Sequence, residues 1–126
     1  MKNFLDIYRI AFIGRTYDEY MKIFSLDASL PGNGPVLDCP AGASSFTAEA
    51  YRSGIDAVAC DILYDRTVDA LAEKGRQDIG HVFDKFDKVS YLYTWKHYKN
   101  KDEVIAYRNK ALNLFISDFP KGWKWK

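Results

Sequence analysis

Two short apolar runs, each ending at or beside an aspartate, constrain the fold of this chain more than any other feature. The first is Val-Leu-Asp-Cys at residues 36–39, and the second is Ala-Val-Ala-Cys-Asp at residues 57–61. Between them, Ser44 and Ser45 offer an N-cap to a helix that Gly54 would end. Strand, helix and strand in this order predict a βαβ unit over residues 35–65, whose two strands are parallel.

The segment before this unit has helical spacing. Residues 1–30 predict two short helices broken at the dipeptide Gly14-Arg15, and Thr16 with Glu19 forms a capping box that opens the second helix. The sequence Pro-Gly-Asn-Gly-Pro at residues 31–35 then predicts a turn or loop, because its prolines fix φ and its glycines accept positive φ.

The second half of the chain is predicted to be mainly helical. Apolar residues from position 66 onward lie on one face of one long helix or two shorter ones, and Asn100 begins another helix that Pro120 ends. Residues 89–95 fit a strand or a helix equally well. We interpret residues 66–119 as a helical insertion or cap, and we expect residues 121–126 to fray.

Length and charge limit the class of protein. With 126 residues, 48% of them apolar and 28% charged, the chain suits one domain with one core. Its net charge of +1 gives no excess of cations for phosphates, so nucleic acid is a disfavoured partner even though aromatic residues and lysines are interspersed over residues 83–101. Asp6 interrupts the N-terminal apolar stretch, and no run approaches the roughly 20 apolar residues that cross a bilayer. These features predict a cytoplasmic protein without a membrane partner.

Metal-binding and disulfide chemistry have little support in the composition. The chain contains 2 cysteines and 2 histidines, which are too few and too widely spaced for a metal centre. If Asp38 paired with Asp61 across the two strands, Cys39 and Cys60 would lie diagonally, roughly 7 to 8 Å apart. A disulfide would then need backbone movement. We therefore expect buried, reduced thiols and no bound metal.

The candidate site lies where the first predicted strand meets the following helix. Backbone N–H groups at this point of a βαβ unit favour anionic ligand groups, and Gly42 allows the backbone to approach a ligand closely. Asp61 ends the second strand, where its carboxylate can accept hydrogen bonds from ribose hydroxyls. The pattern predicts a nucleotide-like ligand. The alternative is a plain packed βαβ unit in which Asp38 and Asp61 are simply solvated.

Residues 36–44, Val-Leu-Asp-Cys-Pro-Ala-Gly-Ala-Ser, resemble motif I of the class I S-adenosylmethionine-dependent methyltransferases, with Pro40 and Ser44 replacing the first and third glycines of the family pattern. Asp61 matches the family's acid after the second strand. The leader Gly-Arg-Thr-Tyr-Asp-Glu-Tyr at residues 14–20 is similar to that of an uncharacterised bacterial branch of the family. The resemblance covers the N-terminal portion of the family fold and implies S-adenosylmethionine as cofactor.

The resemblance also implies roles for individual residues. The backbone of residues 40–42 would face the methionine part of the cofactor, and Asp38 would lie near its amino group. Asp61 would hold the ribose, and Ile62 would pack on the adenine. The implied cofactor-binding residues are therefore Asp38, Pro40, Ala41, Gly42, Asp61 and Ile62.

Two leader residues are candidates for a lid over this cofactor. Arg15 and Tyr20 stand in the segment before the first strand, and the planar guanidinium of Arg15 suits a carboxylate. We expect these two residues to contact the cofactor. The alternative is a surface ion pair between Arg15 and Asp18 or Glu19, worth at most about 1 kcal/mol.

The implied fold is an α/β, Rossmann-like βαβ unit with N-terminal helices and a helical C-terminal half, which amounts to an incomplete class I methyltransferase fold. Its first strand would present an unpaired apolar edge, and soluble proteins normally cover or pair such an edge. We therefore expect a truncated methyltransferase, or a fragment whose sheet is completed by a second copy or a second chain. The implied reaction transfers a methyl group to an acceptor that the sequence does not identify, with no catalytic residue assigned.

Two other functions stay open at this point. The chain could be a non-catalytic remnant or a partner-binding helical module, in which the motif is vestigial. Residues 42–46, Gly-Ala-Ser-Ser-Phe, also resemble part of a nucleophile elbow with Ser44 as the nucleophile of a hydrolase, although Phe46 replaces the second glycine. Capping of the following helix explains Ser44 without catalysis.

Overall fold

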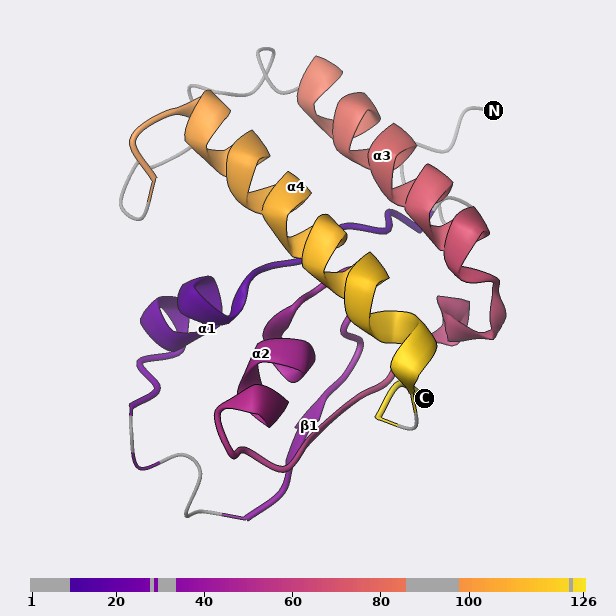
Figure 1. Cartoon of the computed structure of the whole chain (residues 1–126). Coiled ribbons are helices and arrows are strands. Elements are labelled where there is room, and N and C mark those ends of the chain that lie inside the picture. Colours follow the sequence, from indigo (N-terminus) through magenta and orange to yellow (C-terminus); the bar gives the residue numbers. More distant parts are fainter. Residues whose placement is uncertain (1–9, 28, 30–33, 86–97, 123) are drawn as a thin grey trace, which may run out of the picture.

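A computed structural model describes residues 10–27, 29, 34–85, 98–122 and 124–126 of the chain. Helices pack against a two-stranded parallel sheet, which confirms a small α/β fold (Figure 1). The predictions for residues 1–9, for most of the turn at 31–35 and for the ambiguous segment 89–95 lie outside the described residues. The elements in chain order, with η marking a 3-10 helix, are α1 (Tyr17–Ile23), β1 (Val36–Asp38), α2 (Phe46–Arg52), β2 (Ala57–Ala59), η2 (Ile62–Asp65), α3 (Val68–Asp84), α4 (Lys101–Asp118) and η5 (Phe119–Lys121).

The predicted βαβ unit is confirmed as β1, α2 and β2. The two strands are parallel, and α2 ends just before Gly54, whose φ of +85° suits a residue without a side chain. Ala57 and Ala59 are both 0% exposed, whereas Leu37 is 68% exposed. Because side chains alternate between the faces of a strand, one face of the sheet is buried against the core while Leu37 lies on the other.

The strand register differs from the one expected. Asp38 lies opposite Ala59 and not opposite Asp61. Asp61 has already left the sheet, because its side chain accepts a hydrogen bond from the Leu63 N–H and caps η2. The expected burial of the thiols is also wrong, since Cys39 is exposed and the free Cys60 is only half-buried.

Within residues 10–27 the leader contains one helix, α1, while most of the first expected helix lies outside the described residues. The capping box of α1 is present, with the Thr16 hydroxyl accepting from the Glu19 N–H at 3.2 Å and the Glu19 carboxylate accepting from the Thr16 N–H at 3.0 Å. Residues 10–16 are not helical. Instead, the carbonyls of Ile13 and Arg15 accept hydrogen bonds from the backbone between β1 and α2, so they are not available for an earlier helix.

The long helices α3 and α4 run side by side in opposite directions (Figure 1). The apolar face predicted after residue 66 is confirmed as the buried side of one continuous helix, α3. Gly75 lies where this helix meets α4, because a β-carbon built there would be 2.5 Å from Cδ1 of Leu112. Gly80 of the same helix is exposed and has no such neighbour within 4 Å.

The prediction that residues 121–126 fray is wrong. The Ala59 N–H donates to the Lys124 carbonyl at 2.8 Å, and the Lys126 N–H donates back to the Ala59 carbonyl at 2.8 Å. Trp125 is only 7% exposed, and its indole N–H donates to Asp118 at 3.2 Å. The tail is ordered because it satisfies the free edge of β2 and buries an aromatic ring.

One core joins the three predicted segments. Its main cluster contains Phe12 of the leader, Ala59 of β2, Leu71 of α3 and Phe115 of α4. A smaller cluster around Phe46 holds α1 against α2. Within the described ranges, no helix combines the length and the apolar character that crossing a bilayer requires.

Candidate functional site

The predicted site residues meet at the carboxyl ends of β1 and β2. Asp38 ends β1, Asp61 follows β2, and the loop over residues 39–45 connects β1 to α2. Carboxyl ends of parallel strands are the usual ligand-binding side of an α/β sheet. We call the two aspartates together with this loop the strand-end site.

Asp61 is held in one orientation by its neighbours. Its Oδ2 accepts from the Gly42 N–H at 2.9 Å, and its Oδ1 accepts from the Leu63 N–H at 3.0 Å. A carboxylate has about four acceptor positions, so two are left for a ligand hydroxyl pair. The side chain is half-buried, which leaves it within reach from solvent.

Tyr64 of η2 supports the loop, a role that the sequence did not indicate. The Tyr64 hydroxyl donates to the Gly42 carbonyl at 2.7 Å. Burial raises the pKa of Tyr64, so its hydroxyl stays protonated and can donate. Tyr64 also packs against Phe115 and Trp125, so the loop is fixed by the main core. The role of Tyr64 follows from the way α4 and the tail pack on η2, and the periodicity of the sequence does not predict this packing.

Asp38 faces Tyr20 of α1. The Tyr20 hydroxyl lies 3.0 Å from Oδ1 and 2.9 Å from Oδ2 of Asp38. Burial raises the pKa of the Asp38 carboxyl, and the hydrogen bond from Tyr20 opposes that rise. Burial, together with the Asp38 charge, raises the pKa of Tyr20 to about 12. The pair is therefore a protonated phenol beside a half-buried carboxyl, which suits the binding of a cationic group.

The loop before α2 offers an anionic group fewer backbone donors than expected. Pro40 has no N–H, and each N–H of residues 41–46 already has a partner within the chain. Two of those partners are the leader carbonyls of Ile13 and Arg15, which accept from Ala43 at 3.3 Å and from Ser45 at 3.0 Å. The loop therefore has no free backbone donor for an anionic group over these residues. The leader takes the place that a phosphate or carboxylate would occupy.

A glycine permits this close approach of leader and loop. A β-carbon on Gly14 would lie 2.2 Å from the Ser44 nitrogen and 2.3 Å from the Ala43 carbonyl carbon. Both atoms belong to the backbone, so neither can turn away as a flexible side chain does. The same contact buries Ser44, which is 1% exposed and donates its hydroxyl to the Arg15 carbonyl at 2.7 Å. A buried, donated hydroxyl fits a structural role and not that of the hydrolase nucleophile considered above.

Of the remaining predicted residues, Ala41 is buried, and the other three lie at the surface of this site. Ile62 is 75% exposed directly after Asp61, and the side chains of Arg15 and Pro40 are exposed as well. Arg15 is near enough to Tyr20 for its charge to influence the tyrosine. Its expected alternative partner Glu19 is not at the surface, because that carboxylate is 4% exposed and pairs with another arginine.

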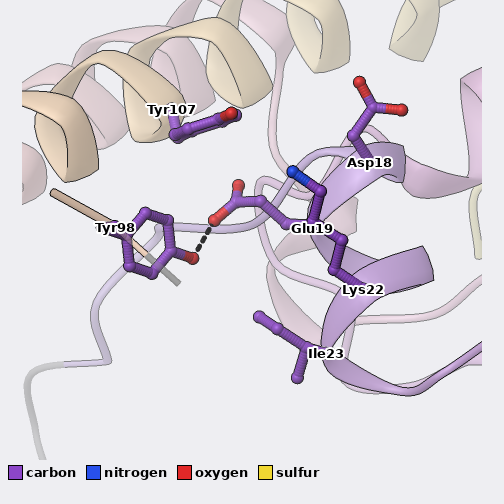
Figure 2. Close-up of a pocket in the computed structure, with 6 residues that line it drawn as sticks. All are labelled: Asp18, Glu19, Lys22, Ile23, Tyr98 and Tyr107. Carbon is purple, nitrogen blue, oxygen red and sulfur yellow. Dashed lines mark hydrogen bonds between the residues drawn. The ribbon is translucent and has the colours of Figure 1, made fainter. Parts of the chain in front are cut away.

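A buried ion pair holds α1 to α4. Nη1 of Arg108 lies 2.8 Å from Oε2 of Glu19. Figure 2 shows the Tyr98 hydroxyl, which donates to the same carboxylate. Burial alone would raise the pKa of Glu19, but the hydrogen bonds from Tyr98 and Arg108 lower it overall. No signal in the sequence connects Glu19 with Arg108, since the two residues are 89 positions apart.

The cavity beside this ion pair is too small for a cofactor. It encloses about 10 Å³ and is lined by α1 residues together with Tyr98 and Tyr107 (Figure 2). That is about the space one water molecule needs. The ion pair therefore holds α1 in place, and Tyr20 of that helix lies at the strand-end site.

Comparisons with known proteins add a relative but no activity. No model of a protein family matches the chain, and no solved structure matches it. An uncharacterized protein of Methanocaldococcus jannaschii is 28% identical over 120 residues, which cover 92% of this chain and 52% of the relative. The chain thus spans about half the length of the curated relative that it matches.

Proposed function

We propose that the strand-end site binds S-adenosylmethionine and that the chain is the cofactor-binding part of a methyltransferase. The observation that carries this proposal is the pair of acids at the carboxyl ends of two adjacent parallel strands. Asp61 is pre-oriented by two backbone N–H groups and keeps acceptor capacity. An oriented acceptor beside an exposed apolar side chain, Ile62, suits a nucleoside.

The chemistry of the side chains fits the nucleoside end of this cofactor best. The ribose diol would donate to Asp61, and the adenine would lie on Ile62. The amino group of the methionine part would donate to Asp38 and to the Tyr20 oxygen, while the Tyr20 O–H donates to Asp38. The cofactor carboxylate has no backbone donor in the loop and would depend on the guanidinium of Arg15.

Bound S-adenosylmethionine would supply an electrophilic methyl group on its sulfonium. The chain's own contribution would be to hold the nucleoside at Asp61 and to orient the methionine part between Asp38 and Arg15. Holding a reactive group within attacking distance of an acceptor supplies much of the rate of such a transfer. The acceptor and any general base stay unassigned.

Calorimetric titration with S-adenosylhomocysteine tests this proposal. Asp61→Ala should weaken binding by about 1.5 to 3 kcal/mol, roughly ten- to hundredfold in Kd, because hydrogen bonds to a charged group are lost. Ile62→Ser should weaken it by about 1 kcal/mol, since apolar contact with the adenine is lost. Ile62 is 75% exposed, so its replacement has little effect on folding.

The matched control is Asp65→Ala, which removes an exposed acid at the end of η2, four positions beyond Asp61. Its affinity should equal that of the wild type. Circular dichroism confirms that each variant is folded. A folded wild type that does not bind, or equal affinities for all four proteins, would contradict the proposal.

A partner-binding role without catalysis is the second candidate, and the sheet favours it. Among the described residues, β1 pairs with β2 on one side only, and its Leu37 is 68% exposed. A second chain or a second copy that adds a strand there would pair the free edge. Sedimentation of the purified chain separates the possibilities for this edge, because a strictly monomeric, well-folded species would contradict pairing between copies.

A further inference from the structure

Cys39 and Cys60 face each other at the ends of the two strands. The Cys60 N–H donates to the Asp38 carbonyl at 2.9 Å, and the Cys60 carbonyl accepts from the Ala41 N–H at 2.9 Å. In a pair of parallel strands, the N–H and the carbonyl of one residue bond to two residues of the neighbouring strand, and the residue between those two is its partner. Pro40 has no N–H, so Ala41 supplies the second bond one residue later. Cys39 is therefore the partner of Cys60, one step beyond the Asp38–Ala59 pair.

This placement brings the two residues to an α-carbon separation that a disulfide can span. Neighbouring strands are about 4.8 Å apart, and disulfides join residues whose α-carbons are about 4.4 to 6.8 Å apart. Directly opposite residues of a parallel pair project from the same face of the sheet. The Cys60 side chain is also close enough to raise the pKa of the Cys39 thiol. Both thiols are free, and the exposed Cys39 is open to a small oxidant.

We propose that Cys39 and Cys60 form a redox pair, which closes to an intramolecular disulfide when a hydroperoxide oxidises the reduced chain. The Cys39 thiol first gives its proton to solvent, and the thiolate attacks one oxygen of hydrogen peroxide. An S–O bond forms, the O–O bond breaks, and the departing hydroxide takes a proton to become water. Cys39 is then a sulfenic acid. The Cys60 sulfur attacks it, the S–S bond forms, and the S–O bond breaks to release a second water. Two thiols lose two electrons in total, and hydrogen peroxide is reduced to two waters.

The bond would modify the strand-end site directly. Cys39 lies between Asp38 and Pro40, and Cys60 immediately precedes Asp61. Closing the bond would fix the ends of β1 and β2 relative to each other and restrict movement of the loop between them. The pairing follows from the backbone ladder alone, so it does not depend on what the site binds.

The test is oxidation of the reduced, folded chain with hydrogen peroxide, followed by digestion without reductant and mass spectrometry. We expect a cross-linked pair of peptides containing Cys39 and Cys60 and a loss of two hydrogen masses from the intact monomer. The same bond should form on the order of tenfold more slowly in urea, because unfolding removes the proximity.

A matched variant moves one thiol along the same face of the same strand. Val58 lies opposite Leu37, so a cysteine there is diagonal to Cys39, roughly 7 to 8 Å away. The variant Val58→Cys/Cys60→Ser should cross-link on the order of tenfold more slowly than the wild type, since that distance exceeds what a disulfide spans. Equal rates for the native wild type and the urea-treated chain would overturn the proposal. So would products limited to unlinked sulfinic acids or to disulfides between molecules.

Discussion

Gly75 and Gly80 of α3 should respond in opposite ways to the same substitution. Replacing an exposed helical glycine by alanine stabilises a helix by about 0.5 to 1 kcal/mol, because the unfolded chain loses conformational freedom. Gly80→Ala should show this gain in full, since its β-carbon would meet nothing within 4 Å. Gly75→Ala has the same gain, but its β-carbon would lie 2.5 Å from Cδ1 and 2.9 Å from Cδ2 of Leu112.

The contact at Gly75 decides the sign of its effect. Leu112 is 1% exposed, so its methyl groups would have to shift within the core to admit a β-carbon at Gly75. Overpacking of this kind costs about 1 to 3 kcal/mol, which leaves Gly75→Ala between neutral and about 2.5 kcal/mol less stable than the wild type. The two alanine variants should therefore differ by about 1 to 3 kcal/mol.

Urea unfolding followed by circular dichroism measures this difference. The cause is tested in a Leu112→Val background, where the shortened side chain makes room for the new methyl group. There, Gly75→Ala should become as favourable as Gly80→Ala. Equal stabilisation by the two alanines in the wild-type background would refute close packing of α3 on α4.

Three further substitutions test the leader and the tail. Tyr20→Phe should raise the pKa of Asp38 further, because the variant lacks the hydrogen bond that opposes the effect of burial. NMR titration of the carboxyl carbon measures this pKa, and an unchanged value would contradict the prediction. Glu19 has a folded pKa below its usual 4.5, so its stabilisation is present above pH 4.5 and is lost as the pH falls through the lower, folded pKa. Glu19→Gln should lower the free energy of unfolding by about 3 to 5 kcal/mol at pH 7, because the charge of Arg108 is left without its carboxylate. Urea titrations at pH 7 and pH 3 should show a smaller loss of stability in acid for this variant than for the wild type. Trp125→Ala should cost about 3 to 5 kcal/mol in the same assay, and a fully stable variant would show that the tail does not contribute to the core.

Local signals in the sequence predicted most of the secondary structure. The capping box of Thr16 and Glu19, the stop at Gly54 and the start at Asn100 are all confirmed, because each depends on residues within one helical turn. The βαβ order followed from two apolar runs and one helix between them. These features need no knowledge of distant contacts.

The details of the site could not be predicted in the same way. The strand register depends on where Asp61 leaves the sheet to cap η2, and a difference of two residues changes which side chains are neighbours. Two of the loop's N–H groups, those of Ala43 and Ser45, are occupied by carbonyls of the leader about 30 residues earlier in the chain. The sequence pattern attributes free donors to this loop, because the segment that takes those donors carries no sequence signal of pairing.

The order of the tail has a practical use for studying the strand-end site. The Asp61 N–H donates to the Lys126 carbonyl at 3.4 Å, and the tail pairs with β2 in the parallel direction. Any group joined to the chain after Lys126 would therefore emerge beside Asp61. A small fluorophore attached there would report ligand binding at close range, without a label on any residue that contacts the ligand.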